Sequence, residues 1–283
     1  MRNFTQSLVA FVFLLNSACV FGQNPGNLGT PNLTAWFKPD ALPLGNVSTW
    51  STTLSSVGGI TVSDPSAPYP QATNTPVGNI SNYNKTLYFS GNTLTNLQGL
   101  QNTGTMSLLQ NNSTSAQGTF FCAYYFPNAG TVNNHMMLYN QTPHAIQFRN
   151  LGMSGRLAVG LSSSNSTNAS RDWSEEFVPN IISYKGNRSS ATSLTAFERG
   201  VTFPAGIASQ SSGTAGLYFG FFPGNGTSPY NGYLHEFIFY NRDLTALEIS
   251  KVHTYLAIKY GVTLGNTGGG TQGDYVATNS TTI

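Results

Sequence analysis

The stretch TFFCAYYF (119–126) decides the fold of this chain. Aromatic and small apolar residues occupy both alternating faces of the stretch, which is typical of a strand that lies inside a sheet and is covered on both sides. The stretch GLYFGFF (216–222) has the same character. Both stretches therefore predict central strands in the core of a β protein.

Other short strand-like runs continue on either side of these two, separated by clusters of Gly, Asn, Ser and Pro. This alternation is typical of all-β proteins, whose strands are joined by turns and loops. So many short strands predict two packed antiparallel sheets. The predicted strands are 33–38, 86–90, 119–126, 135–140, 145–149, 156–161, 177–185, 194–198, 216–222 and 233–240.

The composition of the 283 residues agrees with a β-rich fold. Charged residues make up 8%, far below the roughly 25% of an average globular protein, whereas aromatic residues reach 12%. This balance excludes a coiled coil or a helical bundle. The 12 basic and 10 acidic residues give a net charge of +2 without clustering, so we expect no nucleic-acid partner.

The first 22 residues have the order of a secretory signal peptide. Arg2 precedes an apolar run at 8–15, and small residues lead up to a cleavage site after Gly22. The run is too short to span a bilayer, and no later run reaches that length, so we expect no transmembrane segment. The sequence therefore predicts a secreted protein that is extracellular or held at the cell surface.

The two cysteines bear on the compartment and on stability. A cut before Cys19 with lipid attachment is the alternative to plain secretion, but Asn16 stands where a lipoprotein signal usually has Leu. If Cys19 leaves with the signal peptide, Cys122 has no partner for an internal disulfide. Its apolar neighbours predict a buried, unreactive thiol.

One segment breaks the strand pattern and predicts a helix. The tetrapeptide TALE (245–248) is a capping box, in which Thr245 and Glu248 satisfy each other's backbone amides. An apolar stripe then predicts the face that packs on the sandwich, and Gly261 predicts the left-handed end of the helix. The predicted stripe contains Leu247, Val252, Leu256 and Tyr260.

Several stretches resemble a known family. They are YNGYLHEFIFYNRDLT (230–245), YLAIKYGVTL (255–264), LTAWFKPDA (33–41), VSTW (47–50) and NIISY (180–184). Together they resemble the concanavalin A-like or laminin-G-like sandwich domains of large secreted surface proteins from Bacteroidetes-type bacteria. The tail DYVATN (274–279) is similar to the start of the segment that follows the domain in such proteins.

The resemblance implies a two-sheet antiparallel jelly-roll sandwich with one C-terminal helix packed on it. It places the domain at 23–264 and a Gly-rich linker with the start of a following segment at 265–283. It also implies display at the cell surface beside neighbouring modules of a longer chain. The loop 51–56 lacks the carboxylate found there in relatives, which puts in doubt any ligand binding by that loop.

The acidic residues do not form the pattern of a glycosidase. Glycoside hydrolysis needs two carboxyl groups that face each other across the scissile bond, and no string of carboxylates alternates along a predicted strand. The dense group DWSEE (172–176) is interpreted as a solvated turn. Glu236 lies on an otherwise apolar strand face and is expected to have Arg242 or Lys259 as a structural partner.

No cofactor or metal site is predicted. The four histidines lack the spacing of zinc ligands, and the sequence contains neither a nucleophile elbow nor a phosphate-binding loop. Calcium is the alternative that remains open. It would need oxygen donors from neighbouring loops, for which Asp40, Asp64 and Asp172 are the candidates.

A carbohydrate site on a sandwich typically has an exposed aromatic ring with amide or charged groups beside it. Trp36 and Trp50 are expected in the core. The predicted ligand-binding residues are therefore Trp173, Tyr230, Arg171, Asn133 and Asn134.

These features predict a secreted, non-catalytic interaction module of the adhesion or carbohydrate-binding type, belonging to a larger surface protein. Its expected partner is a glycan or another cell-surface ligand. Two alternatives stay open, namely a glycoside hydrolase acting on polysaccharide and a structural spacer without a ligand, because this fold hosts all three.

Overall fold

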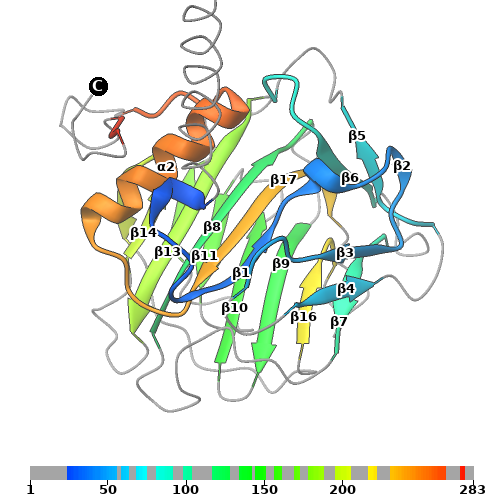
Figure 1. Ribbon diagram of the computed structural model, residues 1–283, viewed down its shortest axis with the longest axis horizontal. Coiled ribbons are helices and arrows are strands. Elements are labelled where there is room, and N and C mark those ends of the chain that lie inside the picture. The colour runs from blue at the N-terminus through cyan, green and yellow to red at the C-terminus, as the bar shows by residue number, and fades with distance from the viewer. Residues whose placement is uncertain are drawn as a thin grey trace, which may run out of the picture.

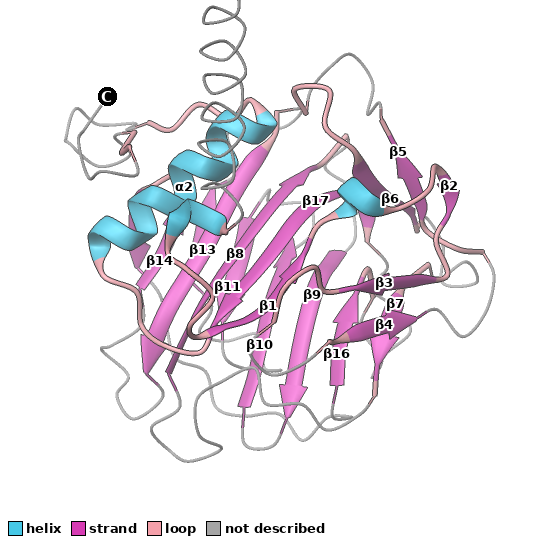
Figure 2. Cartoon of the chain, viewed as in Figure 1, coloured by secondary structure: helices cyan, strands magenta, loops and turns pink. Residues whose placement is uncertain are grey.

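In the computed structural model, two antiparallel sheets face each other and one α-helix lies on the outer surface of one of them (Figure 1). The structure describes residues 24–55, 59–63, 68–74, 81–91, 98–103, 117–127, 134–141, 144–150, 156–160, 169–172, 178–187, 195–204, 216–221, 230–265 and 275–277. This arrangement confirms the predicted sandwich of two antiparallel sheets with a C-terminal helix (Figure 2).

The first sheet has nine strands among the described residues. Eight of them follow one another across the sheet, and the ninth, β1, pairs with residues 237–240 of β17, beyond the part of β17 that pairs with β6. In order across the sheet they are β15 (Val201–Pro204), β14 (Thr195–Glu198), β13 (Asn180–Asn187), β8 (Gln117–Tyr125), β17 (Asn231–Tyr240), β6 (Thr86–Ser90), β5 (Gln71–Thr73) and β2 (Gly45–Asn46), and β1 is Leu33–Phe37.

The second sheet has eight strands in the described part of the chain. In order they are β12 (Ala169–Asp172), β11 (Arg156–Gly160), β10 (His144–Asn150), β9 (Asn134–Gln141), β16 (Gly216–Phe219), β7 (Leu100–Asn102), β4 (Thr61–Ser63) and β3 (Thr49–Ser51). Short 3-10 turns, η1 (Pro25–Asn27) and η2 (Pro39–Ala41), flank β1.

The strand β8 is the central strand that the sequence predicts. It lies between β13 and β17, and all its residues from Gly118 onward are buried. One face of β8 packs into the core between the sheets, and the other face, with Phe121 and Ala123, packs under the helix. Cys122 is buried in the inter-sheet core as predicted, and burial raises the pKa of its thiol.

The two tryptophans near the N-terminus are buried as predicted, but in different layers. Trp50 packs between the sheets, where its ring centroid lies 5.1 Å from that of Phe37 and 5.3 Å from that of Phe219. Trp36 instead belongs to the layer between the first sheet and the helix. The side chain of Trp36 faces away from that of Phe37 because successive strand residues point to opposite faces.

Helix α2 (Ala246–Tyr260) begins and ends where the sequence predicts. The Thr245 hydroxyl accepts the Glu248 amide at 3.3 Å, and the Glu248 carboxylate accepts the Thr245 amide at 2.9 Å. Gly261 ends the helix in the left-handed region, with φ of 67°. The Arg242 guanidinium also binds the Glu248 carboxylate, at 2.6 and 2.9 Å.

The prediction that Leu247 belongs to the buried stripe of the helix was wrong. Val252, Leu256 and Tyr260 are buried against the sheet, but the side chain of Leu247 is 44% exposed. Leu247 precedes Val252 by five residues, which is roughly 140° around an α-helix, so the two cannot share a face. Leu244 and Ile249 fill the corresponding space under the helix.

We expect Thr245→Ala to lower the free energy of unfolding by about 1 kcal/mol, because the first turn of α2 loses its side-chain cap. Denaturant unfolding followed by circular dichroism measures the change. The control is Thr263→Ala, which alters an exposed threonine just beyond the helix and should stay within about 0.5 kcal/mol of the wild type. Equal effects of the two substitutions would contradict the role of the cap.

Candidate functional site

A β-bulge in β17 places two polar residues beneath the helix. Leu234 and Phe237 both face the core between the sheets, and the pairing with β8 shifts register between Leu234 and Glu236. In a regular strand, residues three apart point to opposite faces, so the bulge is what allows this arrangement. His235 and Glu236 therefore lie on the outer, helix-covered side of the sheet.

Glu236 is 1% exposed and accepts hydrogen bonds from four side chains. The indole nitrogen of Trp36 donates to its carboxylate. The hydroxyls of Tyr255 and Tyr260 donate at 2.9 and 2.8 Å, and the Lys259 ammonium donates at 2.8 Å. Of the two predicted partners, Lys259 is thus confirmed, whereas Arg242 binds Glu248 instead.

Lys259 joins this buried carboxylate to an outer one. Its ammonium lies 2.9 Å from the Asp40 carboxylate, which also lies 3.9 Å from the ammonium of Lys38. Burial lowers the pKa of Lys259, but Glu236 and Asp40 outweigh burial, and the net pKa is raised. Burial and the negative charge of Glu236 raise the pKa of Tyr255. Lys259 thus stays charged and Tyr255 stays protonated.

His235 is buried beside this cluster in its neutral form. Its Nε2 atom lies 3.1 Å from the Ser81 hydroxyl, and its ring stacks on that of Tyr260 with a centroid distance of 4.9 Å. Burial, and then the positive charge of Lys259, lower the pKa of His235 to about 3. The histidine is therefore a packed structural group at neutral pH.

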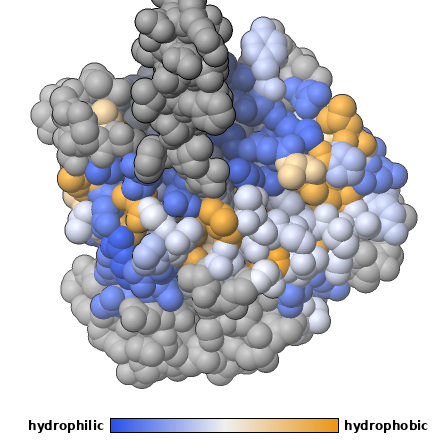
Figure 3. All heavy atoms as spheres, viewed as in Figure 1, coloured by the Kyte–Doolittle hydropathy of each residue, from blue (hydrophilic) through white to orange (hydrophobic). Residues whose placement is uncertain are grey.

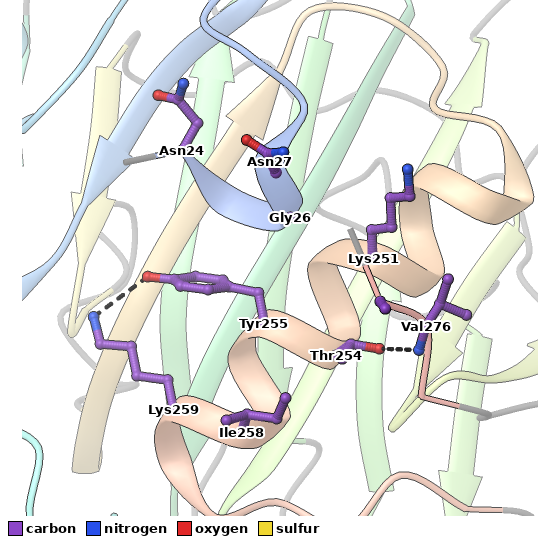
Figure 4. Close-up of a pocket in the computed structure, with 10 residues that line it drawn as sticks. Asn24, Gly26, Asn27, Lys251, Thr254, Tyr255, Ile258, Lys259 and Val276 are labelled. Atoms are coloured by element: carbon purple, nitrogen blue, oxygen red, sulfur yellow. Dashed lines mark hydrogen bonds between the residues drawn. The ribbon is translucent and has the colours of Figure 1, made fainter. Parts of the chain in front are cut away.

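A pocket of about 350 Å³ opens on the outer side of α2, next to this cluster (Figure 4). Three segments that are far apart in the sequence form it, namely 24–27 with η1, helix α2, and 276–277. Tyr255 and Lys259 line the pocket and also bind Glu236, so the pocket and the buried cluster share two side chains. On the face seen in Figure 3, hydrophilic and hydrophobic residues are intermixed.

Backbone contacts hold η1 close to the helix. Gly26 has a φ of 62°, and a Cβ atom there would lie 2.8 Å from the Val252 amide nitrogen. Glycine at this position therefore permits both the turn and its close approach to α2. The Tyr240 hydroxyl donates to the Pro25 carbonyl at 3.1 Å and attaches the turn to β17.

The third wall comes from a segment near the C-terminus. The Val276 amide donates to the Thr254 hydroxyl at 2.8 Å. The Tyr275 hydroxyl donates to the Val262 carbonyl at 3.1 Å and accepts the Leu264 amide at 3.2 Å. Residues 275–277, which lie in the predicted start of a following segment, thus return to α2.

The pocket surface is mostly apolar, and its lining residues include an aromatic ring, two amides and two lysines. The half-buried Tyr255 lies near Asn24 and Asn27, and the Asn24 Oδ1 atom is buried without a hydrogen-bond partner. Lys251 adds a second ammonium to the lining. None of the described residues that line the pocket is acidic. Among the described residues, the lining contains no carboxyl pair for hydrolysis.

Tyr230 was wrongly predicted to be exposed. Its ring is fully buried in the inter-sheet core against Phe89 and Phe126, and its hydroxyl donates to the Tyr233 carbonyl at 3.1 Å. The ring fits there because Gly232 has no side chain, and a Cβ atom at that position would lie 2.8 Å from the ring. A buried ring cannot stack on a sugar.

The other predicted ligand-binding residues lie on the second sheet or outside the described residues. Asn134 is in β9 and Arg171 is in β12. The successive pairings of β9 with β10, β10 with β11 and β11 with β12 place both residues in one row across the sheet. Three strand spacings separate them, or roughly 14 Å. Asn133 and Trp173 lie outside the described residues. Grouping of these residues into one site stays a prediction.

The structure also shows which residues sequence reasoning missed. The residues Asn24, Asn27, Lys251 and Tyr255 line the pocket, and none was predicted as a site residue. The only local signal is the Asn-Pro-Gly-Asn turn at 24–27, which places two amides around a glycine. In the part of the chain that the structure describes, no group of three His, Cys, Asp or Glu residues is placed to hold a metal ion.

Comparisons with known proteins identify the architecture. Domain 4 of AbnA, an extracellular GH43 arabinanase from Geobacillus stearothermophilus solved in complex with arabinotriose, is similar with a TM-score of 0.53 and 16% identity. The match covers 81% of this chain and 100% of that domain. At this identity the similarity establishes the sandwich fold alone.

A sialidase from Trypanosoma rangeli has a region of the same fold. Its complex with sialic acid gives a TM-score of 0.54 at 11% identity, covering 82% of this chain and 34% of the sialidase chain. Another structure of that sialidase gives 0.53 at 11% identity, covering 90% and 39%. The chain thus spans between a third and two fifths of the sialidase chains that it matches.

Sequence comparisons give a narrower match. The pattern of a domain of unknown function (DUF8202) matches residues 248–283, which include most of α2 and the segment that returns to it. No curated protein sequence matches the chain. None of the helices in the described part of the chain has the length and apolar character needed to cross a membrane.

We expect Glu236→Gln to lower the free energy of unfolding by about 3 kcal/mol, because it removes the negative charge that balances the largely buried Lys259. Asp40→Asn is the matched control. This substitution removes the second carboxylate that binds Lys259. The Asp40 side chain is 39% exposed, so its loss should cost at most about 1 kcal/mol. Denaturant titrations measure both changes, and a larger effect of the Asp40 substitution would contradict this assignment.

The buried histidine makes stability depend on pH. The pKa of His235 is lowered from 6.5 to about 3 in the folded chain, so between these values the unfolded chain binds a proton that the folded chain does not. The free energy of unfolding therefore falls as the pH drops below 6.5, with a slope that approaches about 1.4 kcal/mol per pH unit.

His235→Gln removes this contribution, and the variant should lose less stability than the wild type between pH 6.5 and 4.5. Denaturant unfolding at several pH values measures the two slopes. His253, whose pKa burial also lowers to about 3, remains in both proteins and cancels in the comparison. Identical slopes would show that His235 is not buried in its neutral form.

Proposed function

We propose that this chain is a secreted, non-catalytic interaction module that binds carbohydrate. The observation that carries the proposal is the pocket beside α2, in which the ring of Tyr255 lies near the amides of Asn24 and Asn27. Aromatic rings bind the apolar faces of small molecules, and a few well-placed polar groups provide specificity. A sugar presents both kinds of surface, since its ring carries C–H groups and hydroxyls.

The known structures of the same fold support this proposal. The arabinanase domain in complex with arabinotriose is matched over its entire length, so a unit of this architecture occurs in a protein that acts on polysaccharide. The sialidase chains carry such a unit within a longer protein. Both precedents support a carbohydrate-related role for a sandwich module.

The arrangement of Glu236 supports a binding role rather than hydrolysis. A glycosidase needs one carboxyl group that can donate a proton and a second that is free to act as nucleophile or base. Four side chains bind the carboxylate of Glu236, and the same ammonium of Lys259 binds both Glu236 and Asp40. This carboxylate pair therefore serves the packing of α2 and has no free member.

The proposed setting follows from the sequence. Residues 1–22 would direct export, 23–264 would form a domain of the concanavalin A-like or laminin-G-like type, and 265–283 would lead to a neighbouring module at the cell surface. The contacts of Tyr275 with Val262 and of Val276 with Thr254 support a connecting segment that packs on the domain.

A glycan array probed with the full exported chain tests the proposal, with and without calcium. We expect binding to at least one class of glycan and no release of reducing sugar from that class. Release of reducing sugar at an ordinary turnover rate would identify a hydrolase. Absence of binding to every glycan would favour the structural spacer.

The residues predicted from the sequence receive a separate test. If the ligand stacks on Trp173, Trp173→Ala should weaken binding about tenfold, which corresponds to about 1.4 kcal/mol, while Trp173→Phe retains most of the affinity. Isothermal titration calorimetry with the best glycan from the array measures both variants. Unchanged affinity of Trp173→Ala would exclude this tryptophan from the binding site.

A further inference from the structure

The pocket beside α2 has the size of a small-molecule site. Its volume of about 350 Å³ lies within the roughly 300–1,000 Å³ that is typical of such sites. Its walls are fixed from three sides, because η1 packs on the backbone of α2 and Val276 is hydrogen-bonded to Thr254. A ligand would therefore meet a largely preformed surface.

Two amide side chains from the turn line the pocket, namely those of Asn24 and Asn27. An amide group can both donate and accept hydrogen bonds, so it is complementary to the hydroxyl groups of a sugar.

The charge of the pocket is positive. Lys251 and Lys259 line it, together with no acidic residue among those described. Glu236 and Asp40 neutralise Lys259, whereas Lys251 forms no ion pair with any described residue. Lys251 is thus the group that an anionic ligand would neutralise.

The remaining lining is apolar. It includes the ring of Tyr255 and the side chains of Ile258 and Val276, and Ile258 is 59% exposed. In Figure 4 these side chains come from α2 and from the returning segment, and Asn24 and Asn27 come from the turn beside them. The C–H face of a sugar ring is complementary to such a surface.

We propose that this pocket binds an anionic sugar residue, which carries a carboxylate or a sulfate group. The acidic group binds Lys251, a hydroxyl binds the amide group of Asn24, and the C–H face of the ring packs on Tyr255 and Ile258. This inference rests on the proposed carbohydrate-binding function and adds the class of glycan and its location. A neutral sugar would leave the Lys251 ammonium without a counter-charge.

Calorimetric titration of the full exported chain tests the proposal with three probes of similar length, an oligogalacturonate, a sulfated galactan oligosaccharide and neutral cellotetraose. We expect at least one anionic probe to bind at least tenfold more tightly than the neutral one. Its affinity should decrease as salt is raised, because charge attraction contributes to binding. The carboxylated and sulfated probes distinguish the two sources of charge.

Lys251→Met and Asn24→Ala locate the binding site. Lys251→Met keeps most of the side-chain length and removes the charge, and it should weaken binding of the anionic probe about tenfold, while Lys251→Arg retains it. Asn24→Ala should weaken binding severalfold. Lys185→Met removes an equal charge outside the pocket and should leave the affinity unchanged. Thermal unfolding confirms that each variant is folded.

The outcomes separate this inference from the proposed function. Preferential binding of neutral glycans, or binding of anionic glycans that the Lys251 and Asn24 substitutions do not weaken, would overturn the pocket assignment and leave a carbohydrate-binding module. Binding to no glycan on the array would overturn both proposals.

Discussion

The buried carboxylate of Glu236 joins three parts of the molecule that are distant in the sequence. It accepts hydrogen bonds from Trp36 in β1 and from Tyr255, Lys259 and Tyr260 in α2, while it belongs to β17 itself. A carboxylate that is removed from water is stable only if donors and a counter-charge replace the water. The carboxylate thus attaches the last turns of α2 to the sheet, in addition to the apolar packing of Val252 and Leu256.

The bulge at His235 and Glu236 places the carboxylate where it can bind both β1 and α2. Without the extra residue in β17, Leu234 and Phe237 could not both face the core. The bulge keeps the apolar residues inside and turns two consecutive polar residues toward the helix. The same local irregularity thus preserves the sandwich core and provides the attachment point for the last turns of α2.

Local patterns predicted the parts of the structure that depend on near neighbours in the sequence. The capping box, Gly261 at the end of α2 and the two covered faces of β8 are of this kind. The choice between Arg242 and Lys259 as partner of Glu236 stayed open, because the ion pair of Arg242 with Glu248 is seen only in the folded chain.

Features that depend on long-range packing could not be predicted in this way. Alternation along a strand shows that two sets of side chains face opposite sides, but not which side the second sheet covers. For this reason the sequence did not separate the layers in which Trp36 and Trp50 are buried, and Tyr230 was expected at the surface. The pocket was missed because its walls, at 24–27, in α2 and at 276–277, come together only in the folded chain.

The location of the pocket has a consequence for how a ligand affects the domain. Segments 24–27 and 275–277 reach the same part of α2 from opposite ends of the described chain (Figure 1). A ligand held between them would bind the folded arrangement and not the detached one, and so would stabilise the attachment of both segments to the helix. A ligand bound on a face of the sandwich would have no such effect. Occupancy of this pocket, unlike occupancy of the sheet surface, is thus coupled to how firmly the domain holds the segments that connect it to the rest of the chain.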